Sequence, residues 1–270
     1  MDGISPTMLD VYIDESHLEI NGRPVLLYAI VVPHNLEEAF AALAEAKARR
    51  GLLRGVEVKW ALRGGSPEKK AAIKSDVLDI LARHFLCFIS LTSGSSKDEA
   101  FINALRQMRS YAIGFGYSYL NVFHDEGCFP SRKSIRAELD SWLDVQCTAL
   151  ASMDSGYSVP IQFADILAGT FRYILLSRFG TPAKSITLVD EETDEPVVMP
   201  LDALFHLALR HSIWGSMSDT PPEEEATASR GIDSMFAHCF GTGVVANGAF
   251  SEQELATLRE ISTFYRGCMH

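Results

Sequence analysis

Apolar and polar residues follow a pattern that divides the first part of the chain into strands. Residues 9–14 alternate in the manner of a strand, and residues 25–32 form a continuous apolar run that is typical of a buried strand. Asn21-Gly22 lies between them and predicts a tight turn of the kind that closes a hairpin. We therefore expect two neighbouring strands joined by this turn.

The next 150 residues predict strands and helices in alternation. Helices are expected at residues 36–50, 66–83, 97–111, 131–146 and 158–179, and further strands at 56–60, 85–91, 117–123 and 148–153. Such alternation indicates an α/β layered fold with a partly parallel, mixed sheet flanked by helices. Residues 8–180 are expected to form this domain.

The character of the sequence changes after Gly180. In order, we expect an acidic turn at 190–195, a helix at 201–211, a mobile surface loop at 218–231 and a last helix at 251–265. Ser251 followed by Glu254 is the signature of a capping box at the start of that last helix. Residues 181–270 are thus predicted to be a mostly helical C-terminal extension packed on the same core.

Composition and charge narrow the class of protein. The chain has 270 residues, 47% hydrophobic and 22% charged, which is typical of a globular protein with an ample core. The net charge of −11 argues against a broad electrostatic contact with duplex DNA. Residues 45–74, however, hold nine basic and three acidic residues. That local basic stretch either meets phosphates or is a solvated helix surface.

Two further observations concern the cellular compartment. The N-terminus has no signal-peptide pattern, and the longest apolar stretch, residues 161–176, is interrupted by Asp165 and Arg172. We therefore expect a cytoplasmic protein without a membrane partner. The five cysteines are scattered and contain no C-x-x-C pair, so they are expected to be reduced thiols, mostly buried.

Four carboxylates embedded in apolar segments are the candidate chemistry: Asp14, Glu57, Asp125 and Asp165. Acids in such surroundings are costly unless they are paired or bind a metal. A cluster of carboxylates suits divalent cations, and that combination performs phosphoryl transfer in many hydrolases. For Asp14 taken alone, an acid that ends the first strand and caps a turn is the simpler interpretation.

The segment around Asp165 carries more information. On the predicted helix, Gln162, Asp165 and Gly169 lie along one flank, and apolar residues line another. The small residues Ala164, Ala168 and Gly169 would let this helix approach the sheet closely and deliver Asp165 to the strand ends. The alternative is a helix–helix contact that contains a capped acid.

Four segments that occur in this order resemble a known family. They are Tyr12-Ile13-Asp14-Glu15-Ser16, Glu57-Val58-Lys59, Phe123-His124-Asp125-Glu126 and Gln162-Phe163-Ala164-Asp165-Ile166-Leu167-Ala168-Gly169. Together they resemble the bacterial and phage domain-of-unknown-function family numbered 3800 (DUF 3800), which is similar to the RNase H-like, retroviral integrase-like superfamily. The resemblance covers roughly residues 9–179. One departure is His17, where such proteins usually have Gly.

The resemblance implies an RNase H-like metal-dependent nuclease or phosphodiesterase. By that similarity, Asp14, Glu57, Asp125 and Asp165 would bind two Mg²⁺ or Mn²⁺ ions about 3.5 to 4 Å apart. Lys59 would either hold a phosphate oxygen or form a salt bridge with Glu57. The expected partner is nucleic acid, with RNA, DNA and hybrid all open, and a homodimer is also left open.

Other interpretations of the sequence stay open beside the nuclease. A non-catalytic binding or assembly module on the same scaffold is one alternative, and a small-molecule phosphohydrolase is another, because one fold hosts many activities. Ser16 and Gln162 would at most support the metal ligands.

Overall fold

A mixed sheet of six strands forms the centre of the protein. The computed structural model describes residues 7–61, 67–128, 131–189, 196–209, 213 and 243–264. The strands are β1 (Met8–Ile20), β2 (Arg23–Pro33), β3 (Phe85–Ser93), β4 (Tyr119–Asp125), β5 (Gln146–Met153) and β8 (Val244–Gly248). Their order in the sheet is β5-β4-β1-β2-β3-β8, in which β2 is antiparallel to β1 and β3 and the other neighbours are parallel.

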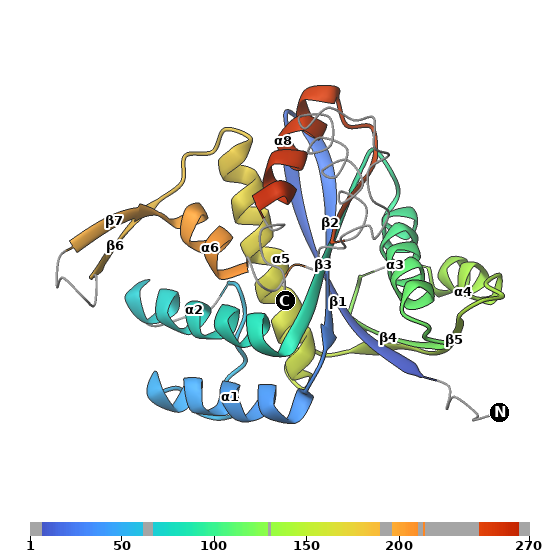
Figure 1. The fold of residues 1–270 in the computed structure, drawn as a ribbon, viewed down its shortest axis with the longest axis horizontal. Coiled ribbons are helices and arrows are strands. Elements are labelled where there is room, and N and C mark those ends of the chain that lie inside the picture. The colour runs from blue at the N-terminus through green and yellow to red at the C-terminus, as the bar shows by residue number, and fades with distance from the viewer. Residues whose placement is uncertain are drawn as a thin grey trace, which may run out of the picture.

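Helices cover both faces of the sheet (Figure 1). On one side lie α1 (Leu36–Arg49), α2 (Pro67–His84), α5 (Val159–Arg178) and α6 (Leu201–Leu209); on the other lie α3 (Lys97–Gly114) and α4 (Arg132–Asp140). The last described helix, α8 (Glu252–Phe264), contacts β8, and β6 (Ser185–Val189) pairs with β7 (Pro196–Pro200) in a separate two-stranded sheet. The predicted α/β fold is therefore confirmed.

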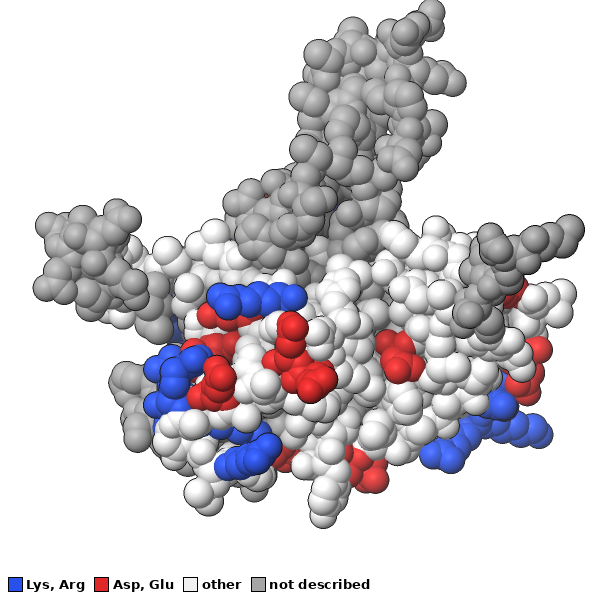
Figure 2. All heavy atoms as spheres, turned by 60° about the horizontal axis from the view of Figure 1, so that its bottom comes forward, with Lys and Arg blue, Asp and Glu red and all other residues white. Residues whose placement is uncertain are grey.

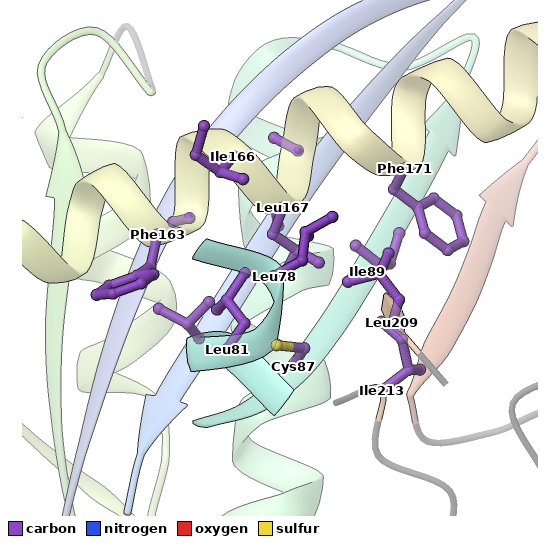
Figure 3. Packing of buried hydrophobic residues seen from close by; sticks show 14 of the residues in the cluster. Leu78, Leu81, Cys87, Ile89, Phe163, Ile166, Leu167, Phe171, Leu209 and Ile213 are labelled. Atoms are coloured by element: carbon purple, nitrogen blue, oxygen red, sulfur yellow. The ribbon is translucent and has the colours of Figure 1, made fainter. Parts of the chain in front are cut away.

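The side-chain alternation of β1 divides the core into two layers. Val11 and Ile13 pack with α3, whereas Tyr12 and Leu18 belong to the layer beneath α5. In that second layer, Figure 3 shows Phe163, Leu167 and Phe171 of α5 directed toward Leu78 and Leu81 of α2 and Ile89 of β3. By the same alternation, Asp14 lies on the α5 side of the sheet. Apolar burial on both faces thus fixes which way each β1 residue points.

The predicted turn and the predicted capping box are both present, and they contact each other. Asn21 and Gly22 take positive φ values of 50° and 78°, which the tight turn between β1 and β2 requires. At the start of α8, Ser251 N–H donates to Glu254 Oε2 at 2.7 Å and Glu254 N–H donates to Ser251 Oγ at 3.3 Å. The Glu254 carboxylate also accepts from Asn21 Nδ2 at 2.9 Å and pairs with Arg23. These contacts hold α8 against the first hairpin.

Several predicted boundaries were wrong. β1 continues past Asp14 to Ile20, so Asp14 is inside the strand and does not end it. Residues 56–60 form no strand, and α4 ends at Asp140, six residues before the predicted end. The strands β6, β7 and β8 were not predicted, and β8 extends the main sheet.

Some predictions concern residues that the structure does not describe. The acidic turn at 190–195, the loop at 218–231, Cys239 and Cys268 lie outside the described residues. Cys87, Cys128 and Cys147 are buried free thiols, as expected. By length and composition, α5 is apolar enough to cross a membrane, and 72% of that stretch is buried inside the fold.

Candidate functional site

Asp14, Asp125 and Asp165 come from three elements and act on one another electrostatically. Asp14 of β1 is 7% exposed, and its pKa is raised to about 8, first by burial and then by the neighbouring charges of Asp165 and Asp125. The backbone N–H of Glu15 donates to Asp14 Oδ1 at 2.7 Å and opposes this rise. The three acids therefore share one site, in which they repel each other.

Burial also raises the pKa values of the other two acids, Asp165 and Asp125. Burial raises the pKa of Asp165, while the N–H of Trp60 and the charge of Lys59 lower it. Asp125 is the last residue of β4, two residues beyond Phe123, where the strand was predicted to end. Burial raises its pKa as well, and hydrogen bonding from backbone groups, including Ser155, opposes this rise.

The segment 56–60 extends beside α5, and side chains of that helix take the place of a neighbouring strand. Val58 N–H donates to Gln162 Oε1 at 3.0 Å, and Trp60 N–H donates to Asp165 Oδ2 at 2.6 Å. Alternate amides of an extended segment point the same way, and helix residues three apart lie on the same side. Gln162 and Asp165 match this geometry, which explains why an alternating sequence forms no strand here.

Segment 56–60 carries the remaining acid and its cation. Lys59 Nζ lies 3.0 Å from Glu57 Oε1, so the salt-bridge interpretation of Lys59 is confirmed. The hydrogen bond to Glu57 is also the main cause that raises the pKa of Lys59. Glu57 raises the pKa of Asp165, which shows that it acts on the same site. Its charge is already balanced by Lys59, unlike that of Asp14.

Trp60 explains the glycine in the α5 segment. A Cβ atom on Gly169 would lie 2.1 Å from Cγ of Trp60, so the indole packs directly on the helix backbone. The small residue therefore lets Trp60, and not the sheet, approach α5 at this point. Lys74 Nζ lies 3.7 Å from the centroid of the Trp60 ring, and Asp165 raises the pKa of Lys74, although burial lowers it more. The sequence analysis did not predict a role for Trp60 or Lys74. The feature that could have indicated Trp60 is Gly169, because a glycine inside a helix leaves room for a bulky aromatic side chain.

The donor chemistry suits a hard divalent cation. Carboxylate oxygens are the ligands that Mg²⁺ and Mn²⁺ prefer, and a cation would relieve the repulsion that raises the pKa of Asp14. Among the described residues, however, no three His, Cys, Asp or Glu side chains are already arranged to hold a metal ion. Figure 2 shows one face of the molecule on which acidic side chains lie directly beside basic ones. The four-ligand metal site stays a prediction.

No protein-family model matches the chain, and neither a curated protein nor a solved structure matches it. The resemblance to family 3800 and to RNase H-like proteins therefore stays a prediction from the motifs. What bears on function is the geometry and charge of the site.

Proposed function

We propose that the protein is a metal-dependent hydrolase of phosphodiester bonds, with Asp14, Asp125 and Asp165 as metal ligands and Glu57 as a fourth acid. The observation that carries the proposal is the burial of Asp14, only 7% exposed, beside the charges of Asp165 and Asp125 from two other elements, which together raise its pKa to about 8. A structural acid gains nothing from such surroundings. A carboxylate that binds a cation does, because the ion compensates for both burial and repulsion.

The residues around the acids support this role. The N–H of Trp60 fixes one oxygen of Asp165 and so restrains the rotation of its carboxylate. Asp14 is restrained in the same way by the N–H of Glu15. A bound Mg²⁺ or Mn²⁺ would polarise a phosphoryl oxygen and lower the pKa of a bound water. Lys59, on exchanging its Glu57 partner for substrate, would neutralise a phosphate oxygen.

A second candidate is a non-catalytic binding or assembly module. It is favoured by one observation: segment 56–60 already engages two of the acids, since Glu57 pairs with Lys59 and Asp165 accepts from the amide of Trp60. In such a module the same contacts would serve to hold the segment 56–60 on α5. Metal-dependent turnover separates the two candidates.

The direct test is cleavage of single-stranded RNA, single-stranded DNA and an RNA–DNA hybrid with Mg²⁺, Mn²⁺ or EDTA. Asp14→Asn should lower the rate by more than about 100-fold, because the charge that binds the ion is lost. Asp165→Asn should do the same, although its amide oxygen can still accept from Trp60 and keep the segment in place. Glu19→Gln, on an exposed position of β1, is the matched control and should cleave normally.

The outcomes distinguish the candidates. Cleavage that needs the metal and both aspartates supports the proposal. Turnover of mononucleotides without cleavage of polymers would indicate a small-molecule phosphohydrolase. If no substrate is cleaved with either ion, the binding module becomes the better account.

A further inference from the structure

We propose that Gln162 is a positioning residue that fixes the spacing between the two sides of the carboxylate cluster; this inference rests on the proposed function. Gln162 is only 4% exposed, and both the oxygen and the nitrogen of its side-chain amide form hydrogen bonds. Oε1 accepts from Val58 N–H at 3.0 Å, and Nε2 donates to the Ser155 carbonyl at 2.8 Å. One side chain therefore bridges two segments that are about a hundred residues apart in sequence.

The segment that contains Ser155 supports Asp125. Ser155 belongs to the turn between β5 and α5, in which Tyr157 and Ser158 donate backbone hydrogen bonds to the Asp154 carbonyl. The backbone of Ser155 also faces Asp125 and lowers the pKa of that carboxylate. Gln162 holds the carbonyl of the same residue, so the position of Asp125 is coupled to that of Gln162 through one residue of the turn.

The segment that contains Val58 carries Glu57 and Lys59. Val58 lies between them, and its own side chain is 1% exposed in the α5 layer of the core. Because residues 56–60 belong to no strand, the Val58 and Trp60 amides bind side chains of α5 in place of a sheet neighbour. Releasing Val58 would leave Glu57 and Lys59 free to move away from Asp165.

The amide of glutamine matches both partners at once. Val58 offers a donor and the Ser155 carbonyl an acceptor, and a primary amide has one group for each. Methionine has nearly the same volume but neither group, so Gln162→Met removes both bonds with little change in packing. Residues that orient metal ligands from outside the coordination sphere typically contribute about 10- to 100-fold to metal affinity.

Gln107 offers a matched control. It is also a buried glutamine, on α3 at the opposite face of the sheet, and its Nε2 donates to the Gly243 carbonyl at 3.3 Å. Gln107→Met also removes a buried side-chain hydrogen bond, but the Gly243 carbonyl still accepts from the Ile89 N–H at 2.7 Å, so this variant should cost less stability than Gln162→Met. Only Gln162→Met should weaken the binding of Mn²⁺ by the carboxylate cluster.

The experiment measures Mn²⁺ affinity by calorimetry and amide hydrogen exchange in the metal-free full-length protein. We expect Gln162→Met to weaken Mn²⁺ binding about 10- to 100-fold and to speed exchange at Val58. Gln107→Met should bind Mn²⁺ within about twofold of the unmodified protein. If Gln162→Met does not fold, Gln162→Asn replaces it: its shorter amide reaches one partner at most, and at least about tenfold weaker binding is expected.

Failure of this inference differs from failure of the proposed function. If the unmodified protein binds Mn²⁺ and the folded Gln162 variant binds it equally well, Gln162 has no positioning role and the proposed metal site stands. Unchanged exchange at Val58 would also overturn the inference. If the unmodified protein binds no Mn²⁺, the proposed function fails first, and the role of Gln162 toward it fails as well.

Discussion

The indole of Trp60 occupies the space that a side chain at Gly169 would need. A Cβ atom at that position would meet three atoms of Trp60, the nearest at 2.1 Å, which no ordinary contact allows. The same tryptophan donates its backbone N–H to Asp165, one turn earlier on α5. Packing and hydrogen bonding therefore place one residue against the helix in two independent ways.

Gly169→Ala should destabilise the protein although alanine favours helices. Overpacking at a buried contact costs about 1–3 kcal/mol, which exceeds the gain of about 1 kcal/mol in helix propensity. Denaturant unfolding measures the difference. Gly114→Ala at the end of α3, where an added Cβ has no neighbour within 4 Å, is the control and should be neutral or slightly stabilising. Equal stability of the Gly169 variant and the unmodified protein would contradict the contact with Trp60.

Asp14 should make the metal-free protein less stable as the pH rises. Its pKa is 3.8 in an unfolded chain and about 8 in the fold, so the folded state binds more protons between these values. The free energy of unfolding should fall across that window, and Asp14→Asn should remove most of the fall. At pH 8 the variant should be more stable by about 2–5 kcal/mol.

Unfolding in urea at pH 5 and pH 8, with EDTA present, measures this effect. Glu19→Gln, at an exposed position of the same strand, should leave the pH dependence unchanged. An Asp14→Asn variant with the pH profile of the unmodified protein would show that Asp14 is not buried among other charges.

The carboxylate of Glu254 should stabilise the protein at neutral pH, whereas that of Asp14 should destabilise it. Burial raises its pKa, but hydrogen bonds from Arg23, Ser251 and Asn21 outweigh burial and lower the pKa to about 2. The contribution of the carboxylate is therefore complete above pH 4.5 and is lost as the pH falls toward 2. We expect Glu254→Gln to cost about 1–3 kcal/mol at pH 7 and close to nothing near pH 2.

Thermal or denaturant unfolding at the two pH values checks this prediction. Glu252→Gln on the exposed first turn of α8 is the control. A constant difference between Glu254→Gln and the unmodified protein at both pH values would mean that the charge of Glu254 does not hold α8 on the hairpin.

Sequence patterns predicted those parts of the fold that depend on local residues. Asn21-Gly22 specified its turn, and Ser251 with Glu254 specified its cap, because each motif contains its own hydrogen-bond partners. The burial pattern of β2 could be read from its continuous apolar run. β8 could not be predicted, because five residues of moderate hydrophobicity become a strand only when β3 offers its edge.

The candidate site was only partly predictable for the same reason. The flank of α5 with Gln162, Asp165 and Gly169 was visible in the sequence, since helical spacing defines it. Its partner was not: alternation at 56–60 indicated an extended segment, but nothing local showed that amides of Val58 and Trp60 would bind side chains of a helix. Long-range contacts of this kind are set by the packing of the whole chain.

Calorimetric titration of Mn²⁺ tests the central claim most directly. With Asp14 mostly protonated at pH 7, metal binding should displace its proton, so the heat should depend on the ionisation enthalpy of the buffer. We predict binding near neutral pH with net proton release, and loss of both in Asp14→Asn. Absence of binding, or equal binding with equal proton release in Asp14→Asn, would contradict the assignment of these carboxylates as a metal site.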